Sequence, residues 1–414
     1  MADFRIATLN INGGRDIVKR ANLFGLMSAK NVDIMFVQET HIDTVIENNW
    51  RTEWAGHLVL SHMSNLSAGV GIIFSKSFCP LSYESKEVIE GRLLVVKAIY
   101  ETFTFFLINV YAPTGGLERQ HFFTTLSEVL KGCETDGYVF LGGDFNCTID
   151  DNLDRNHREP HKASQDVLRR ALAMGGLVDV WRRLNGDVRQ YSWSHCRENR
   201  LIMARLDRFY CLEHHFNIFK KCRMTPVGFS DHFFVCCDVF IANIKPKSAY
   251  WHFNSALVSD KHFREIFVYF WNDFRNDKHS FGTLKKWWDH GKAQIRDLCQ
   301  HYSRNVTNNM AKSMEQLEEE IMELQGLCIN GGGGSELHVL ADRKSCLKNL
   351  LGLKAQGALV RSRYKFANEM DTPSKFFFDL EKKNGQKRFF HTCFSEDGNE
   401  LIDSNEIRER AVNF

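Results

Sequence analysis

The sequence is short of three things: paired cysteines, long apolar runs and net charge. Its 12 cysteines include no Cys-x-x-Cys pair, which excludes the usual zinc framework and does not match a secreted disulfide scaffold. We therefore expect reduced thiols, in a protein of the nucleus and cytoplasm that is not secreted. No apolar run approaches the roughly 18 residues that span a bilayer, and the first residues carry no signal peptide.

The net charge is +2, from 53 basic and 51 acidic residues. A nearly neutral chain does not by itself indicate a polyanion partner, so any nucleic-acid surface has to be local. The 414 residues, 43% of them hydrophobic, are enough for two or three domains of roughly 100–200 residues each. The 33 phenylalanines favour packed sheets.

Many of the predicted strands are apolar along their whole length, which is typical of sheets that are covered on both faces. Strands are predicted at residues 4–9, 33–37, 58–61, 69–74, 93–99, 103–110, 138–141, 191–194, 205–210 and 233–240. Helices are predicted between them at 15–29, 117–130 and 163–174. The fold class that follows is α/β: two packed β-sheets flanked by helices, a four-layered α/β sandwich.

After about residue 242 the pattern becomes mainly helical, and residues 244–247 indicate a linker. Helices are predicted at 263–274 and 284–298. Two apolar stripes with helical spacing flank the glycines at 331–334, and they consist of Met314, Leu317, Ile321, Leu324 and Cys328, and of Leu337, Leu340, Lys344, Leu347 and Leu351. Each stripe is short, which favours an antiparallel hairpin within the chain over a coiled coil. We predict domains at 1–242, at 243–335 (a helical linker region) and at 336–414 (a helical basic region).

The basic character of the last region comes from a series of lysines and arginines: Arg343, Lys344, Lys348, Lys354, Arg361, Arg363, Lys365, Lys382, Lys383, Lys387 and Arg388. Two interpretations stay open. The residues form an ordinary solvated helix face, or they form a surface that contacts phosphate backbones.

Polar side chains adjoin five of the predicted strands. Asp231 and His232 follow a turn at Gly228 and Ser230 and precede an apolar strand, where both groups are unfavourable unless they are paired or bound. Alone, this pair is explained equally well by a solvated loop. The same arrangement recurs at other strand ends, at Asn10, Glu39, Tyr111 and Asp144. Strand ends at one edge of a sandwich can converge, so we expect one common site.

Two of these clusters suit a hydrolytic metal site. Glu39, Asn10 and Asp231 offer carboxylate and amide oxygens, and Mg²⁺ binds a few such ligands while it keeps several waters and phosphate oxygens. Asp144 and Asn146 lie two residues apart on a turn, a spacing that suits holding a water whose proton the carboxylate accepts.

The remaining groups suit phosphate chemistry. His232 and Tyr111 are donors for phosphate oxygens, and Asp207 is placed to fix the tautomer of His232. Each piece alone has an ordinary explanation as a turn, a helix start or a packing corner. Their order along the chain is more specific than any one of them.

That order carries a family resemblance. The motifs are Leu9-Asn10-Ile11-Asn12-Gly13, Gln38-Glu39-Thr40-His41, Asn109-Val110-Tyr111-Ala112-Pro113, Gly143-Asp144-Phe145-Asn146, Leu206-Asp207-Arg208 and Ser230-Asp231-His232. Over residues 3–240 they resemble the endonuclease/exonuclease/phosphatase superfamily. More narrowly, they resemble the abasic-endonuclease-like domain of the second-reading-frame proteins of long interspersed element (LINE) retrotransposons.

The resemblance implies a Mg²⁺-dependent enzyme, with Mn²⁺ as a substitute, that nicks one strand of double-stranded DNA and leaves a 3′-hydroxyl to prime reverse transcription. The implied metal ligands are Glu39, Asn10 and Asp231. The implied catalytic residues are Asp144 and Asn146 at the water, Tyr111 and His232 at the phosphate, and Asp207 behind His232. The implied DNA-facing residues are Arg155, Ser192 and Ser230.

Residues 357–363, 373–378 and 380–386 are similar to the segment that precedes the reverse transcriptase in such elements. We therefore expect a product truncated before the polymerase, with element RNA as a further partner of the basic region. Two alternatives stay open: an abasic-site endonuclease or exonuclease (or a related phosphoesterase), and a non-catalytic nucleic-acid-binding remnant. We also expect that removing residues 245–414 leaves a folded, active domain.

Overall fold

In the computed structural model the described residues are 2–64, 67–101, 103–132, 137–197, 200–241, 255–329 and 334–361, with 393–394 and 400–401. Residues Met1–Ser362 form one compact unit and Arg363–Phe414 a second. In the second unit only β15 (Cys393–Phe394) and β16 (Glu400–Leu401) are described. The predicted linker at 244–247, the glycines at 331–333 and the basic and reverse-transcriptase-like segments after 362 lie outside the described residues.

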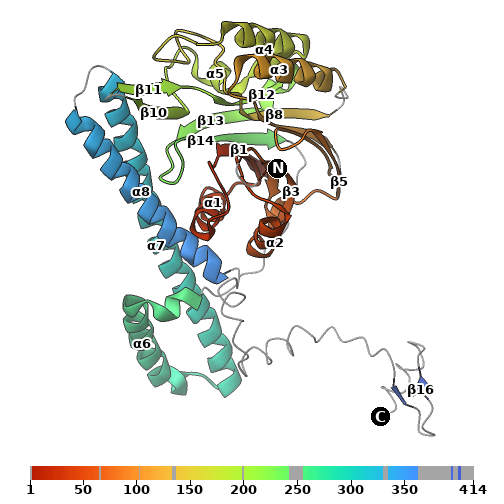
Figure 1. The fold of residues 1–414 in the computed structure, drawn as a ribbon. Helices are drawn as coiled ribbons and strands as arrows, with labels where there is room; N and C mark the ends of the chain where they lie inside the picture. Colours follow the sequence, from red (N-terminus) through yellow and green to blue (C-terminus); the bar gives the residue numbers. More distant parts are fainter. Residues whose placement is uncertain are drawn as a thin grey trace. The chain divides into compact units, whose positions relative to one another are not determined.

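The first unit contains two six-stranded sheets that lie face to face (Figure 1). The first sheet runs β13 (Phe219–Thr225), β14 (Phe234–Ile241), β1 (Ala2–Asn10), β2 (Ile34–Gln38), β4 (Val70–Phe74), β3 (His57–Ser61). The second runs β5 (Ser82–Ile89), β6 (Leu93–Ile99), β7 (Thr104–Tyr111), β8 (Tyr138–Asp144), β12 (Asp207–Leu212), β9 (Leu177–Asp179). The pairs β1–β2 and β7–β8 are parallel, and the other neighbours are antiparallel.

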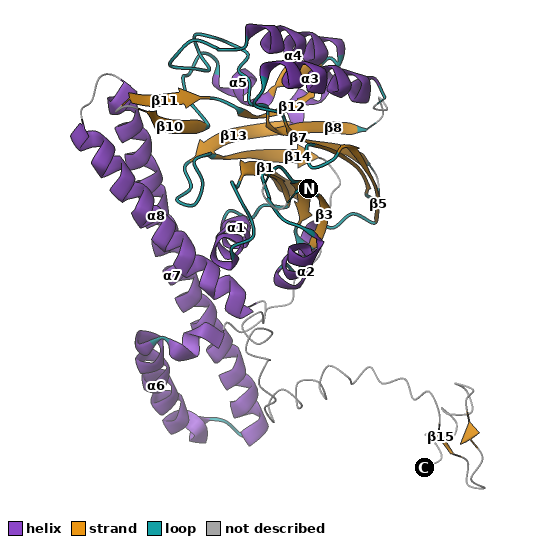
Figure 2. Ribbon diagram, viewed as in Figure 1, coloured by secondary structure: helices purple, strands orange, loops and turns teal. Residues whose placement is uncertain are grey.

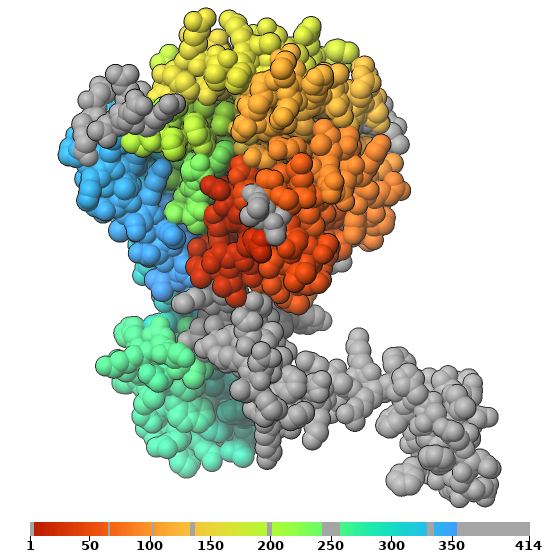
Figure 3. All heavy atoms as spheres, in the orientation of Figure 1, coloured from red at the N-terminus to blue at the C-terminus, as the bar shows by residue number. Residues whose placement is uncertain are grey.

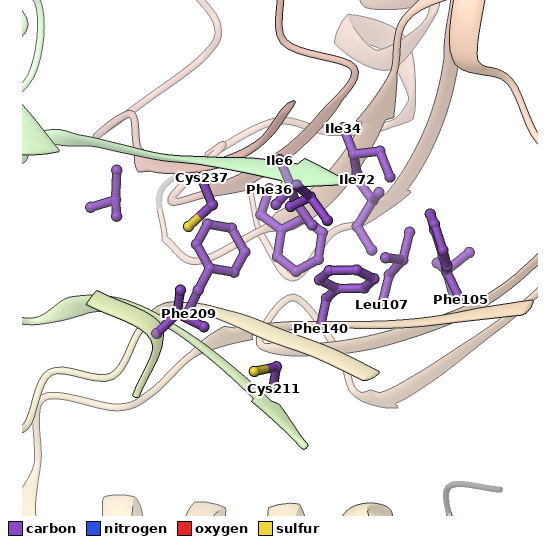
Figure 4. Close-up of a cluster of buried hydrophobic side chains, with 14 of the residues drawn as sticks. Ile6, Ile34, Phe36, Ile72, Phe105, Leu107, Phe140, Phe209, Cys211 and Cys237 are labelled. Atoms are coloured by element: carbon purple, nitrogen blue, oxygen red, sulfur yellow. The ribbon is translucent and has the colours of Figure 1, made fainter. Parts of the chain in front are cut away.

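An apolar core joins the two sheets (Figure 4). Side chains alternate between the two faces of a strand, so Ile6 and Phe36 enter this core while Ala7 and Met35 face the helices on the other side. The ring of Phe36 lies 5.5 Å from that of Phe209 in the second sheet. Each fully buried side chain of this kind contributes about 1.5–3 kcal/mol, which keeps the two sheets in a fixed relation.

Helices cover the outer face of each sheet (Figure 2). Helices α1 (Ile17–Ala29) and α2 (Thr44–Glu53) cover the first sheet, and Asp16 and Asp43 cap them by accepting backbone N–H bonds. Helices α3 (Gly116–Lys131) and α4 (Lys162–Met174) cover the second, and the short α5 (Val180–Asn185) follows β9. The predicted four-layered sandwich is confirmed.

The helical region contains α6 (Lys261–Asn276), α7 (Leu284–Ile329) and α8 (Gly334–Arg361). Helices α7 and α8 pack together as the predicted hairpin, and α8 also packs on α1. Ile321, Leu340, Leu347 and Leu351 are buried in the same apolar cluster as Leu23 of α1. The predicted domain boundaries at 242 and 335 stay predictions about independent folding.

The structure departs from the predicted elements where a segment is polar. Helix α2 and the edge strands β5 and β13 were not predicted, because exposed faces give them few apolar residues. The hairpin β10 (Trp193–Arg197) and β11 (Arg200–Ala204) extends the strand predicted at 191–194. The ten cysteines whose side chains the structure describes are free thiols. Among the described residues, no helix is long and apolar enough to cross a membrane.

Candidate active site

Strand register brings three of the predicted residues together in the second sheet. Tyr111 ends β7 and pairs with Asp144 at the end of the parallel strand β8. Asp207 begins β12 and pairs with Asp144 from the other side. The three residues therefore form one row across adjacent strands, and Asp144 and Asp207 are fully buried.

Asn10 joins this row to the first sheet. Its side-chain nitrogen donates to Glu39 Oε1 at 2.9 Å and to Asp144 Oδ2 at 3.0 Å. Its Oδ1 accepts the backbone N–H of Asn12 at 3.0 Å. The amide nitrogen, and not the oxygen, therefore faces the carboxylates. Asn10 thus holds two carboxylates in place, one after β2 and one at the end of β8, and its role as an oxygen ligand of a cation stays a prediction.

His232 completes the cluster. Its Nδ1 lies 2.8 Å from Asp207 Oδ2, and its Nε2 lies 3.9 Å from Asp144 Oδ2. Ser230 fixes the loop, because its hydroxyl donates to the backbone oxygen of Asn10 at 2.7 Å and accepts the N–H of His232 at 3.1 Å. Glu39, Asp144 and His232 are thus gathered in one place, as their order in the sequence predicted.

The carboxylates and the imidazole change each other's pKa values. Burial raises the pKa of Asp144 to about 6, although His232 opposes the shift. Burial alone would lower the pKa of His232, but the carboxylates of Asp207 and Asp144 outweigh it and raise the pKa to about 10. At neutral pH the cluster therefore holds an imidazolium beside a carboxylate that is able to accept a proton.

Tyr111 contacts two charged groups, the carboxylate of Glu39 and the guanidinium of Arg92. Burial raises the pKa of its hydroxyl, and the carboxylate of Glu39, to which it is hydrogen-bonded, raises it further. The guanidinium of Arg92 lies 4.9 Å from the centre of its ring. The hydroxyl therefore stays protonated and serves as a donor.

Strained backbone is concentrated around the site. Glu39, Asn146, Asn12 and His41 all have positive φ, at 53°, 45°, 46° and 49°, a conformation that is uncommon in residues other than glycine. The backbone N–H of Asn146 donates to Asp144 Oδ1 at 2.9 Å, and its side-chain nitrogen donates to the backbone oxygen of Ala112 at 2.9 Å. Such strain persists where the surroundings over-determine it, as they often do in active sites.

These groups open into a pocket of about 340 Å³. It is lined by Asn12, Glu39, Thr114, Arg119, Asn146, Arg155, Glu159, Pro160, His161, Trp193, Leu206, Asp231 and His232. Arg155 lines this pocket, and its guanidinium pairs with Glu159 at 2.5 Å; its contact with DNA stays a prediction. Asp231 also reaches it, and its carboxylate accepts bonds from Trp193 Nε1 at 3.0 Å and Asn12 Nδ2 at 3.4 Å.

The pocket has the donors that a hard divalent cation requires. The carboxylates of Glu39 and Asp231 both line the pocket, which fits a cation that binds few protein ligands and keeps most of its waters. Among the described residues, Asp144, Asp207 and His232 also form a cluster whose ligand atoms lie within 4.8 Å of one another. Those three groups are buried, and His232 is hydrogen-bonded to Asp207 and lies 3.9 Å from Asp144, so they fit a catalytic triad better than a cation site.

Ser192 lies elsewhere than predicted. Its side chain is fully buried, and its hydroxyl accepts the backbone N–H groups of Leu206 and Asp207, both at 2.9 Å. The expectation that Ser192 faces DNA is therefore wrong. A small hydroxyl satisfies two buried donors here, and it fixes the strand start that carries Asp207.

Three residues near the site were missed. Trp193 bonds Asp231, Arg92 lies over Tyr111, and buried Arg119 donates to the backbone oxygen of Asn146. Arg119 follows the Tyr-Ala-Pro motif closely, and Trp193 lies in the strand predicted at 191–194, next to Ser192. No local sequence pattern marks Arg92 as a site residue, because only the pairing of β6 with β7 brings it close to Tyr111.

Comparison with known proteins agrees with this geometry. The pattern of the Endonuclease/Exonuclease/phosphatase family matches residues 7–232. The chain belongs to this family. Members of the family are metal-dependent nucleases and phosphatases, so the predicted resemblance and enzyme class are confirmed.

The chain is also similar to the "Transposon TX1 uncharacterized 149 kDa protein" of Xenopus laevis, with 36% identity over 413 residues. The match covers 99% of this chain and 31% of that protein, so the chain spans about a third of the length of this relative. The AP endonuclease LMAP from Leishmania major has 19% identity and a TM-score of 0.48, over 57% of this chain and 87% of that chain. The 3′ phosphatase NExo from Neisseria, solved with a product DNA hairpin, has 20% identity and a TM-score of 0.48, over 57% and 100%.

Proposed function

We propose that the protein is a Mg²⁺-dependent DNA endonuclease that nicks one strand of double-stranded DNA and leaves a 3′-hydroxyl for target-primed reverse transcription by a LINE-type retroelement. The observation that carries the proposal is the buried row of Tyr111, Asp144 and Asp207 with His232 across it, opening on a pocket that Glu39 and Asp231 line. Similarity to a transposon protein over nearly the whole chain supports the retroelement assignment.

The side chains divide the chemistry between them. Asp144 accepts the proton of the attacking water, for which a pKa of about 6 is suitable. Asn146 orients that water, since its backbone is fixed by Asp144 and its side-chain nitrogen by Ala112. His232, as an imidazolium held by Asp207, and Tyr111, as a neutral donor, stabilise charge on the phosphate oxygens.

Glu39 and Asp231 would hold the divalent cation, and Asn10 would position Glu39 against Asp144. When bound, the cation supplies electrostatic stabilisation of the charge that develops on the phosphate and the leaving oxygen. Mn²⁺ is expected to substitute, because it favours the same oxygen ligands.

A plasmid assay tests the proposal. Supercoiled DNA with and without one abasic site is incubated with the full chain under a titration of Mg²⁺ or Mn²⁺. We expect open circles from both substrates, ends that a polymerase extends directly, and loss of nicking in Asp144→Ala and His232→Ala. Strict dependence on the abasic site would favour the repair alternative, and DNA binding without nicking under either metal would favour the non-catalytic one.

Two further parts of the proposal concern partners and place. We propose the nucleus as the place of action, because the proposed substrate is double-stranded chromosomal DNA. Element RNA is proposed to bind the basic region that follows residue 336, much of which lies outside the described residues. Filter binding of a labelled element transcript, with an unrelated transcript of equal length as competitor, measures that interaction.

A further inference from the structure

Helix α8 packs directly on the loop that carries Asp231 and His232. A Cβ placed on Gly228 would lie 2.4 Å from Lys348 Cβ and 2.5 Å from the Lys348 backbone nitrogen. Only glycine permits this approach, because any side chain would overlap the helix. Figure 3 shows the blue atoms of α8 against the red atoms of the first residues, and α8 also packs on α1. A helix outside the family match at 7–232 thus touches the catalytic loop.

Two lysines of α8 lie at this contact. Lys344 and Lys348 are one helical turn apart and therefore share a face. Lys344 is half-buried, its Nζ lies 3.4 Å from Ser194 Oγ, and the charge of Asp231 acts on it. Lys348 is exposed, and its charge acts on Lys19 of α1. Lys19 in turn donates to the backbone oxygen of Asn12, which lines the pocket.

These lysines differ from their basic neighbours. Arg343 pairs with Glu320 at 3.1 Å, and Lys30 pairs with Glu318 at 2.7 Å, so both are neutralised by α7. In the part of the chain that the structure describes, Lys344 and Lys348 form no ion pair. Like charges four residues apart disfavour a helix, and Lys348 adds repulsion with Lys19. Asp231 attracts Lys344 and Lys19, and Asp16 and Glu39 also attract Lys19. Lys348 is exposed and forms no ion pair among the described residues, so it favours an anion that does not belong to the chain.

We infer that Lys344, Lys348 and Lys19 form a phosphate-binding lysine ridge at the Asp231 edge of the pocket, which holds the DNA backbone next to the scissile phosphodiester. The inference rests on the proposed function and extends it, because it assigns part of the substrate surface to the helical hairpin. It also gives the nearly neutral chain the local basic surface that DNA binding needs. Lysine suits a backbone contact, since it acts as a point charge without base recognition.

The test measures binding apart from cleavage. Binding of a fluorescent duplex to the full chain is followed in EDTA between 50 and 200 mM salt, for the wild type and for Lys344→Gln/Lys348→Gln. Each lost phosphate contact lowers the slope of log K against log salt by ~0.9, so the double variant should lower it by ~1.8. With metal present, its KM should rise several-fold while kcat stays near the wild-type value.

Lys285→Gln/Lys286→Gln is the matched control, because it removes two exposed lysines from the start of α7. It should leave both the slope and KM unchanged. Lys344→Arg/Lys348→Arg keeps the charges and should keep the salt slope, which separates loss of charge from damage to the fold.

The outcomes are distinguishable. Equal slopes for the double variant and the control would overturn the lysine ridge. A fall in the kcat of the double variant with an unchanged salt slope would also overturn the lysine ridge. That result would mean that the lysines position Asp231 and do not bind phosphate. Absence of DNA binding in the wild type would overturn the proposed function itself.

Discussion

The Nδ1 of His232 lies 2.8 Å from Asp207 Oδ2, and both side chains are buried. The residues are 25 positions apart: Asp207 begins β12 of the second sheet, and His232 lies in the loop before β14 of the first sheet. The pair leaves Nε2 directed toward Asp144 at 3.9 Å. The carboxylate therefore sets both the charge and the direction of the imidazole.

Asp207→Asn tests this dependence. An amide keeps the shape but removes the charge that holds His232 protonated, so kcat should fall about 10²–10⁴-fold, the usual contribution of one proton-transfer or charge-stabilising group. Nicking rates on plasmid DNA and circular dichroism measure activity and fold. Asp166→Asn on the exposed face of α4 is the control. Rates like the wild type in Asp207→Asn would contradict the assigned role.

Asn10→Ala tests the connection between the sheets. The substitution removes the donor that Glu39 and Asp144 share, so their mutual repulsion should loosen the metal site. We expect the Mg²⁺ concentration for half-maximal nicking to rise about 10–100-fold, as for other residues that orient metal ligands. High Mg²⁺ should restore part of the rate. An unchanged Mg²⁺ dependence, with exposed Asn217→Ala as control, would remove Asn10 from this role.

Ser192→Ala separates a structural role from a DNA contact. The hydroxyl satisfies two buried N–H groups, and leaving a buried donor unsatisfied costs about 1–3 kcal/mol. The free energy of unfolding should fall by that order, with a lower kcat through displacement of Asp207. The salt dependence of DNA binding should not change. A raised KM at unaltered stability would instead support the DNA contact first expected here.

The ion-pair network around Asp154 predicts how stability depends on pH. Burial alone would raise the pKa of Asp154, but Arg205 and Arg208 hold it well below its ordinary 3.8. Because the folded pKa is depressed, the carboxylate stabilises the fold above pH 3.8, and this contribution is lost as pH falls further. Asp154→Asn should cost about 3–5 kcal/mol at pH 7, the usual effect of breaking a buried pair.

Urea unfolding at pH 7 and at steps down to pH 3 measures this effect. The difference between the wild type and Asp154→Asn should shrink as the pH falls below 4. A difference that stays constant over this range would show that the network does not depend on the charge of Asp154.

Removing residues 245–414 tests the predicted boundary. Both sheets and every residue of the triad lie before residue 242, so the shortened chain should fold and keep its kcat. It should also expose the face of α1 that Leu347 and Leu351 cover, at about 1.5–3 kcal/mol for each buried leucine lost. Thermal unfolding and size-exclusion chromatography should show lower stability and self-association. An inactive fragment at saturating DNA would place the boundary elsewhere.

The sandwich could be predicted because its strands are buried on both faces and are apolar throughout. Strand β2 and strand β8 show this plainly, since nearly every residue in them is buried. Strand β5 could not be found in this way, because it is an edge strand and most of its side chains are exposed. Helix α7 was predicted only in pieces, since polar residues interrupt its apolar stripe.

The site was predictable in part for a different reason. Asp144, Asp207 and His232 stand at strand ends, and strand ends at one edge of a sandwich can converge. The burial of Ser192 and the orientation of the Asn10 amide depend on a few specific hydrogen bonds that no sequence spacing encodes. The contact of Lys348 with Gly228 joins residues 120 positions apart, and the hydrophobic pattern of α8 predicts only its pairing with α7.

The hydrogen bonds of the Asn10 amide determine how the enzyme responds to substitutions in its core. One nitrogen donates to a carboxylate beside each sheet. A small shift of one sheet relative to the other would therefore separate Glu39 from Asp144 without unfolding either sheet. The cleavage rate should therefore respond to small changes in the relative position of the two sheets. Substitutions in the phenylalanine-rich core between the sheets should therefore lower the cleavage rate at a smaller loss of stability than is needed to unfold the protein.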